Sequence, residues 1–229
     1  MSDVYVYFED LPGVFSEERK LLELCQQSWE AQGWTFNILK RGDARWHPRY
    51  SEVETNANLV LNSPTPLTAS WQRCSYYRWL ALQVMTETGG LLIDYDMINY
   101  NFPVQDLKPG RYHGRSQFSS DVPAGLCPPT PCVIDKEPLE NIIELFAQYR
   151  GEPAWDYRCP QLRKECTDQL LLHFHGTHVG PLTWSDQPWC HMYGSPGWKE
   201  ASVVHYTHWS IARQHTGNRM SCILLERPL

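Results

Sequence analysis

The sequence predicts an α/β protein in which helices flank a mostly parallel central sheet. Residues 4–8 and 35–40 are short runs of β-forming side chains, and an amphipathic helical segment separates them. Such a β-α-β unit places its two strands parallel. A second helical segment, at residues 69–88, leads into a predicted strand at residues 91–94, whose three apolar residues are typical of a strand buried on both faces. The 229 residues are enough to bury a sizeable core.

Local signals mark the ends of these elements. Ser16 precedes two glutamates, as is common at a helix N-terminus, and Gly33 suits the end of the same helix. Gly89 and Gly90 separate the second helix from its strand. The remaining expected elements are helices at residues 138–151 and 164–176, a strand at residues 201–206, and irregular connections at residues 41–66 and 99–136. The rest of the C-terminal part is rich in proline and tryptophan and is expected to be irregular.

Composition limits the class of protein. A net charge of −6 with 42% hydrophobic residues indicates a folded, acidic protein with no general affinity for polyanions. The N-terminus lacks the pattern of a signal peptide, and no run of about 18 apolar residues is present, so we expect no membrane span and a cytoplasmic location. The eight cysteines do not have CxxC spacing, and we expect reduced thiols rather than disulfides or a zinc site.

Two aspartates, Asp94 and Asp96, follow the apolar strand at its carboxyl end. Ligands of open α/β sheets bind outside the carboxyl ends of the strands. Two ordinary acids in a surface turn would give the same letters, but adjacent buried carboxylates are costly without a cation because each raises the other's pKa. Hard divalent cations prefer carboxylate oxygens. The pattern therefore favours a metal site here.

The segment "SYYRWLALQVMTETGGLLIDYDM", residues 75–97, resembles the DxD segment of metal-dependent GT-A glycosyltransferases. It is most similar to the type that includes α-mannosyltransferases, capsular polysaccharide transferases and glucosylating bacterial toxins. The likeness is strong over residues 70–100. It implies a GT-A-like fold, a Mn²⁺ or Mg²⁺ cofactor and a nucleoside-diphosphate sugar as donor. It also implies one glycosyltransferase domain over residues 1–229, with a nucleotide-sugar-binding half at 1–100 and an acceptor-side half at 101–229.

The resemblance assigns roles within the segment. Asp94 is similar to the first motif aspartate, which contacts the donor and can join the metal site, and Asp96 is similar to the second, which ligates the metal. Arg78 is similar to the helix arginine that reaches the donor sugar. Ser75 stands where the family usually has a donor-binding aspartate, so the identity of the donor stays open. Cys74 and Leu92 also depart from the usual pattern, in place of serine and tyrosine.

Two C-terminal motifs extend the likeness. "VVHY", residues 203–206, resembles the strand end of glycogenin-like transferases, which implies His205 as a third metal ligand, with His208 as the alternative. An imidazole ligand suits manganese better than magnesium. "TDQLLLHF" resembles a helix start in retaining GT-A enzymes, which implies Asp168 and Gln169 beside the reaction centre. A helix N-terminus also favours an acid at that position for purely structural reasons.

The resemblance implies that the first strand lies where the nucleotide base binds, so Tyr7 is a candidate to stack on the base, although ordinary core packing is the simpler explanation of this residue. The sequence thus predicts sugar transfer from a nucleoside-diphosphate sugar to an acceptor hydroxyl, with retention of configuration. We expect a saccharide or protein acceptor rather than a nucleic acid, because the chain is acidic. Another metal-dependent nucleotide enzyme (a nucleotidyltransferase or phosphohydrolase) and a non-catalytic sugar-nucleotide or glycan binder are the alternatives. The oligomeric state is not predicted.

Overall fold

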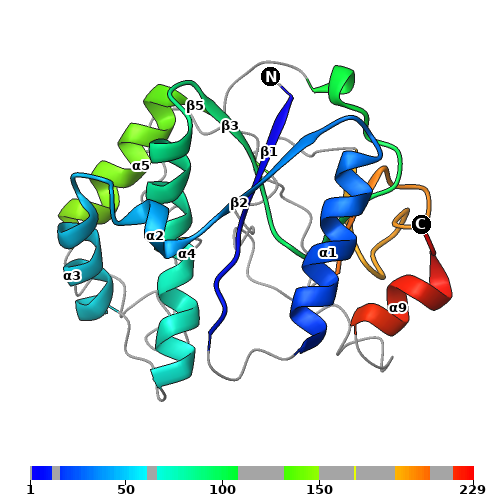
Figure 1. Ribbon diagram of the computed structural model, residues 1–229, viewed down its shortest axis with the longest axis horizontal. Coiled ribbons are helices and arrows are strands. Elements are labelled where there is room, and N and C mark those ends of the chain that lie inside the picture. Colours follow the sequence, from blue (N-terminus) through cyan, green and yellow to red (C-terminus); the bar gives the residue numbers. More distant parts are fainter. Residues whose placement is uncertain are drawn as a thin grey trace.

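The protein is an α/β structure with helices on both sides of a central group of strands, as the computed structural model in Figure 1 shows. The structure describes residues 2–11, 16–60, 66–107, 132–149, 168, 189–206 and 219–229. Its helices are α1 (Ser16–Glu30), α2 (Arg41–Ala44), α3 (Tyr50–Val60), α4 (Pro66–Met85), the short 3-10 helix η1 (Val104–Asp106), α5 (Lys136–Gln148) and α9 (Arg219–Glu226). Helices α2 to α5 lie on one side of the strands, and α1 and α9 lie on the other (Figure 1). The predicted α/β class is confirmed.

The first sheet contains the strands that the sequence predicted. Its order is β2 (Thr35–Leu39), β1 (Asp3–Tyr7), β3 (Gly89–Ile93) and β5 (Cys132–Asp135). Strand β1 pairs parallel with both β2 and β3, whereas β5 pairs antiparallel with β3. Residues 99–136 were expected to form an irregular connection, and this expectation is wrong for residues 132–135, which form β5. Strand β5 has only four residues, too few to show an alternating pattern.

The two faces of this sheet pack against different helices. Successive residues of a strand point to opposite faces. Val4 and Val6 belong to a core cluster that includes Trp29 of α1, whereas Tyr5 belongs to the cluster formed with α3, α4 and α5. All five residues of β3 are buried, as predicted for a strand covered on both faces. The carboxyl end of β3 therefore emerges between two helical layers.

The segment at residues 41–66, expected to be irregular, contains helices α2 and α3. The local signal for α3 is weak because its buried side chains are few and one of them is polar; they are Tyr50, Val53, Asn56 and Ala57. Asn56 Nδ2 donates to the carbonyls of Phe146 and Ala147 at 3.3 and 2.5 Å. These carbonyls lie in the last turn of α5, where helical acceptors lack partners of their own. Long-range contacts thus stabilise a helix whose local signal is weak.

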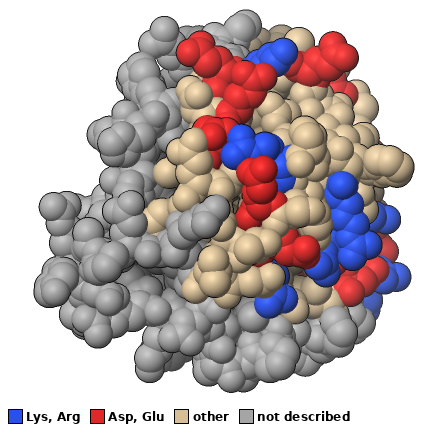
Figure 2. Space-filling view, turned by 90° about the vertical axis from the view of Figure 1, so that its left-hand side faces the viewer, with Lys and Arg blue, Asp and Glu red and all other residues tan. Residues whose placement is uncertain are grey.

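Basic side chains of the same segment are paired with acids. Arg41 Nη2 lies 2.8 Å from Glu54 Oε1, and Arg49 Nε lies 2.6 Å from Glu52 Oε2. Arg49 also forms an ion pair with Glu144 of α5. On the side of the molecule that carries α3 and α5, acidic and basic side chains lie next to one another rather than in separate fields (Figure 2). The local positive charge is therefore largely balanced.

A second, smaller sheet follows directly from the first. Its order is β4 (Met97–Asn99), β7 (Val203–His205) and β6 (Cys190–Met192). Strand β7 confirms the strand predicted at residues 201–206, whereas β4, β6 and α9 were not predicted. Strand β4 is antiparallel to β7, and β6 is parallel to it. Only the turn at Asp94–Asp96 separates β3 from β4, so this turn joins the two sheets.

The structure tests some of the other expectations. None of the helices that it describes combines the length and apolar character needed to cross a membrane. Among the described cysteines, Cys25 and Cys74 are free thiols, as expected. Val4 and Trp29 share a core cluster with Tyr206 and Ile223, so both predicted halves contribute to one core. The division at residue 100 stays a prediction.

Candidate metal centre

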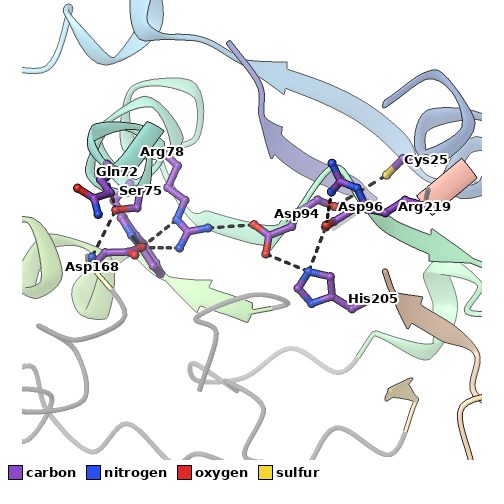
Figure 3. Close-up of polar contacts among 10 residues, drawn as sticks. Cys25, Gln72, Ser75, Arg78, Asp94, Asp96, Asp168, His205 and Arg219 are labelled. Atoms are coloured by element: carbon purple, nitrogen blue, oxygen red, sulfur yellow. Dashed lines mark hydrogen bonds and ion pairs between the residues drawn. The ribbon is translucent and has the colours of Figure 1, made fainter. Parts of the chain in front are cut away.

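Asp94 and Asp96 occupy the first and third positions of a tight turn. The Met97 N–H donates to the Asp94 carbonyl at 3.1 Å, which closes a four-residue turn. Aspartate is favoured at the first position of such turns. The chain reverses direction within the turn, so the two carboxylates lie on the same side of it, as Figure 3 shows. The predicted convergence of the two aspartates is thus produced by the link between β3 and β4.

Helix α1 holds this turn in place. The Met97 carbonyl accepts hydrogen bonds from the Cys25 thiol at 3.1 Å and from Trp29 Nε1 at 2.9 Å. Burial raises the pKa of the Cys25 thiol well above its ordinary value, and the negative charge of Asp96 adds to this effect. Cys25 therefore acts as a neutral hydrogen-bond donor. These two hydrogen bonds were not predicted from the sequence.

His205 reaches the aspartates through the register of the second sheet. Met97 pairs with His205 across β4 and β7, and the Tyr206 N–H donates to the Asp96 carbonyl at 2.9 Å. His205 Nε2 consequently lies 3.0 Å from Asp96 Oδ1 and 3.5 Å from Asp94 Oδ2. His205 and Asp96 are buried, and the Asp94 side chain is 28% exposed. The three residues predicted as metal ligands therefore meet in one cluster.

The chemistry of this cluster fits a divalent cation. One ligand atom from each of Asp94, Asp96 and His205 lies within 4.8 Å of the other two. Two carboxylate oxygens and an imidazole nitrogen are a donor set that Mn²⁺ accepts readily. The partial exposure of Asp94 leaves that side of the cluster open to solvent. The arrangement can hold a metal and leave positions for water or phosphate oxygens.

Arg78 lies between two carboxylates. Its Nη1 donates to Asp94 Oδ1 at 3.0 Å, and its Nε and Nη2 donate to Asp168 Oδ2 at 2.9 and 2.5 Å (Figure 3). Trp79 Nε1 donates to the same Asp168 oxygen at 2.7 Å. The Asp168 side chain is only 1% exposed. Two residues predicted from separate motifs are thus brought together, and Asp168 has an arginine partner. Its place at the reaction centre stays a prediction.

Ser75 lies on the same side of α4 as Arg78. Its hydroxyl donates to the Gln72 carbonyl at 2.6 Å and accepts from the Asp168 N–H at 3.4 Å. Ser75 therefore contacts the Asp168 segment through a neutral hydroxyl. Gln169 and His208 lie outside the described residues, so their predicted roles remain predictions.

Tyr7 ends β1, one residue beyond the pair that Val6 forms with Ile93 of β3. The Tyr7 hydroxyl donates to Glu9 Oε2 at 3.0 Å, and the same oxygen lies 3.5 Å from the Cys74 sulfur. Burial raises the pKa of the Tyr7 hydroxyl, and burial together with Glu9 raises the pKa of Cys74 to about 12. Both groups are therefore neutral at physiological pH. Tyr7 is half-buried, and its proposed contact with a nucleotide base stays a prediction.

The sequence did not point to Arg219 or Glu18. Arg219 Nη1 donates to Asp96 Oδ2 at 2.8 Å, and Arg219 Nη2 forms an ion pair with Glu18. Glu18 is separated from Arg219 by 201 positions. No local motif joins residues so far apart, and Glu18 was read only as part of a helix start. The only sequence feature that marks Glu18 is its place in the first turn of α1, and acids are common at that position in any helix.

Comparison with known proteins supports the fold. No protein-family model and no curated protein sequence matches the chain. Among solved structures, the chain is similar to a glycosyltransferase involved in the glycosylation of the major capsid of PBCV-1, with 16% identity over 93% of this chain and 95% of that chain and a TM-score of 0.57. It also matches the PaToxG glycosyltransferase, with 14% identity over 77% of this chain and 69% of that chain and a TM-score of 0.44.

The first of these likenesses covers nearly the whole of both chains and establishes the fold. The chain shares the α/β fold of that glycosyltransferase, as predicted. At this level of identity the likeness does not extend to the reaction, which depends on particular residues. The function is therefore argued from the site.

Proposed function

We propose that the protein is a metal-dependent glycosyltransferase that moves a sugar from a nucleoside-diphosphate sugar to an acceptor hydroxyl, with retention of configuration. The observation that carries this proposal is the cluster of Asp94, Asp96 and His205 at the carboxyl end of β3. The cluster lies where open α/β sheets bind nucleotides. The fold shared with a glycosyltransferase supports the same reaction class.

The residues of the cluster suit a leaving diphosphate. A divalent cation held by Asp94, Asp96 and His205 would stabilise the negative charge that develops on the departing diphosphate oxygens. Mn²⁺ is the cation we propose, because one of the three ligands is an imidazole. The partly exposed Asp94 lies on the side from which the diphosphate would approach.

Arg78 is suited to orient the donor. Its guanidinium is fixed by Asp168 on one side and by Asp94 on the other, and its side chain is 11% exposed. A cation with a fixed planar geometry can bind a sugar hydroxyl or a phosphate oxygen in one orientation. Orientation of the reacting groups accounts for a large part of the rate enhancement in group transfer. We therefore propose that Arg78 positions the donor sugar above the metal ligands.

The acceptor we propose is a saccharide or a protein. Arg41 and Arg49, in the most basic stretch of the described chain, both form ion pairs with glutamates. On the described part of that face, acidic side chains lie beside basic ones (Figure 2), whereas nucleic-acid binding requires a field of positive charge. Acceptor binding that weakens steeply with salt would favour a nucleic acid instead.

A panel of UDP-, GDP- and CDP-sugars with Mn²⁺ tests the proposal, with release of nucleoside diphosphate as the measurement. We expect one donor to be turned over and Asp96→Asn to lower the rate by about 100-fold or more. Asp106→Asn makes the same chemical change at an exposed position outside the cluster and should be fully active. NMR of the product should show the anomeric configuration of the donor. Full activity of Asp96→Asn would contradict the proposed chemistry.

Two alternative classes give different products in the same assay. A phosphohydrolase or nucleotidyltransferase would release inorganic phosphate or pyrophosphate. Such enzymes use further acids near the first pair, and here the nearby Glu18 and Asp168 are both paired with arginines. A non-catalytic binder is favoured by one observation, the neutral Ser75 hydroxyl in place of the usual aspartate. Tight binding of a sugar nucleotide without turnover would identify that class.

A further inference from the structure

Each oxygen of Asp96 faces a different partner. Oδ1 lies 3.0 Å from His205 Nε2, and Oδ2 accepts a hydrogen bond from Arg219 Nη1 at 2.8 Å. The two oxygens of Asp94 also face different partners, because Oδ2 lies toward His205 and Oδ1 accepts a hydrogen bond from Arg78. Each aspartate therefore presents one oxygen to the metal cluster while an arginine holds the other (Figure 3).

Arg219 is itself held from several directions. Its Nη2 contacts Glu18 of α1 and lies 3.2 Å from the Tyr95 hydroxyl, and its guanidinium lies 5.3 Å from the centre of the Tyr95 ring. Arg219 is 6% exposed and Glu18 is 8% exposed. Burial opposes the charge of Arg219, but Asp96, Tyr95 and Glu18 raise its pKa overall. The guanidinium is thus a permanently charged group with a fixed plane.

The helix that carries Arg219 is anchored at its other end. Arg227 Nη1 donates to the carbonyls of Trp198 and Ala201 at 3.0 and 2.7 Å, and the Tyr193 hydroxyl donates to Glu226 at 2.5 Å. Cys222 and Ile223 are buried between the two ends. Helix α9 is therefore held at both ends, and it positions Arg219 beside Asp96.

We propose that Arg219 and Glu18 form a positioning pair that makes Asp96 a one-oxygen ligand of the metal. The inference rests on the metal centre of the proposed function and deepens it. With Oδ2 held by Arg219, Asp96 cannot rotate to bind a cation through both oxygens, and Oδ1 stays directed at the position shared with Asp94 and His205. Partners that orient a ligand in this way typically change metal affinity by about 10-fold to 100-fold when they are removed.

The formal charge of the cluster also fits a divalent cation. The cluster of Glu18, Asp94, Asp96, Asp168, Arg78 and Arg219 contains four carboxylates and two guanidinium groups. Its formal charge is therefore −2 with His205 neutral, which equals in magnitude the charge of one divalent cation. Without either arginine, two carboxylates of the cluster would lack their counter-ion.

Charge and orientation have opposite effects on metal affinity, and variants that conserve charge separate them. If Arg219 only offsets negative charge, its removal should strengthen cation binding, and a lysine should serve equally well. If Arg219 orients Asp96, lysine should fail, because an ammonium group lacks the planar fork that contacts Asp96 and Glu18 together. Glu18→Asp also separates charge from orientation. The shorter side chain keeps the negative charge but places the carboxylate farther from Arg219.

The test is Mn²⁺ affinity of the full chain, measured by isothermal titration calorimetry in the absence of donor. We expect both Arg219→Lys and Glu18→Asp to bind Mn²⁺ about 10-fold more weakly than the unmodified protein. Arg227→Lys is the matched control, because it changes the same residue type on the same part of the chain but only affects the anchoring of α9. It should retain full Mn²⁺ affinity. Circular dichroism verifies that each variant is folded.

Other outcomes overturn the inference. Unchanged Mn²⁺ affinity in Arg219→Lys would leave only a role in charge balance, and equal weakening in Arg227→Lys would assign the effect to loosening of α9. If Arg219→Lys does not fold, the Mn²⁺ affinity of Glu18→Asp decides between orientation and charge balance instead. Failure of the proposed function gives a separate result. A protein that binds Mn²⁺ but turns over no sugar nucleotide would refute the reaction and leave the positioning pair intact, whereas absence of Mn²⁺ binding would refute both.

Discussion

Asp168 shows how much a single buried residue contributes to the site. One of its oxygens accepts hydrogen bonds from Arg78 Nε, Arg78 Nη2 and Trp79 Nε1. Removal of one member of a buried ion pair leaves the other charge uncompensated, which costs about 3–5 kcal/mol. We therefore expect Asp168→Ala to lower the free energy of unfolding by about 3–5 kcal/mol, measured by urea denaturation. The same change should loosen Arg78, which would keep its contact with Asp94.

An exposed ion pair provides the control for this prediction. Glu52 pairs with Arg49 at three residues' spacing, and the Glu52 side chain is 55% exposed. Exposed pairs contribute little, so Glu52→Ala should change the unfolding free energy by less than about 0.5 kcal/mol. If Asp168→Ala were as mild as Glu52→Ala, Asp168 would not be the anchor of Arg78.

The candidate site was predictable only in part from the sequence. The residues that were predicted lie close together along the chain, and those that were missed lie far apart. Asp94, Asp96 and Arg78 belong to one local segment, so their pattern was visible in the sequence. His205 was reached only through a likeness to another family's strand end, and the register of β4 and β7 explains why it lies there. Arg219 and Glu18 meet through the packing of α1 against α9, and a long-range ion pair between single residues has no sequence pattern.

At the scale of elements, β3 depends on close contact with β1. Gly90 lies against the ring of Tyr5, and a Cβ at this position would meet the ring carbons at 2.6 and 2.7 Å. Tyr5 is buried, so its ring has little room to move. We expect Gly90→Ala to lower the free energy of unfolding by about 1–3 kcal/mol, measured by urea denaturation. The displaced β3 would also carry the Asp94–Asp96 turn away from His205.

Gly42 is the matched control for Gly90. It lies in α2, and a Cβ at this position would meet no atom within 4 Å. Since alanine favours helix over glycine, Gly42→Ala should leave stability unchanged or raise it by up to about 1 kcal/mol. A Gly90→Ala protein as stable as Gly42→Ala would show that β1 and β3 can separate without cost.

His47 connects the α2–α3 link to α4 and makes this part of the fold sensitive to acid. Its Nδ1 accepts the Arg49 N–H at 3.0 Å, and its Nε2 lies 2.5 Å from Gln83 Oε1. Burial lowers the pKa of His47 below 6.5; Gln83 opposes the shift and Arg49 adds to it. Below pH 6.5 the unfolded chain therefore binds a proton that the folded protein resists, and stability falls as the pH decreases.

The measurement is the unfolding free energy at about pH 7.5 and at about pH 5.5, for the unmodified protein and for His47→Gln. We expect a smaller loss of stability on acidification in His47→Gln, because the variant has no imidazole to protonate. An equal loss in both proteins would show that other groups, and not His47, cause the acid sensitivity.

The elements that sequence reasoning found and missed differ in the length of their apolar pattern. Strands β1 and β3 and helices α1, α4 and α5 have continuous apolar signals and were predicted to within a few residues. Strands β4, β5 and β6 have three or four residues each, and α9 has eight. Short elements form because partners elsewhere in the chain pair with them, and such partners cannot be identified before the fold is known.

At the scale of the whole molecule, the candidate metal centre lies where the two sheets meet. Asp94 and Asp96 follow β3 of the first sheet, whereas His205 ends β7 of the second. Helix α1 binds the turn between them through Trp29, and α9 binds it through Arg219. A cation at this position would connect both sheets and both helices, so its binding should stabilise the fold as well as the site.

Thermal unfolding with and without Mn²⁺ tests this connection. Free Mn²⁺ at about 100 times its Kd should add about 2.7 kcal/mol if it binds only the folded state. For a chain of 229 residues this corresponds to a rise in Tm of roughly 5–10 °C, reversed by EDTA. Asp96→Asn should show no rise relative to its own metal-free Tm, because the bridge needs ligands from both sheets, whereas Asp106→Asn should respond like the unmodified protein. If Asp96→Asn gained as much stability from Mn²⁺ as the unmodified protein, the cation would bind elsewhere, and the junction of the sheets would be held by protein contacts alone.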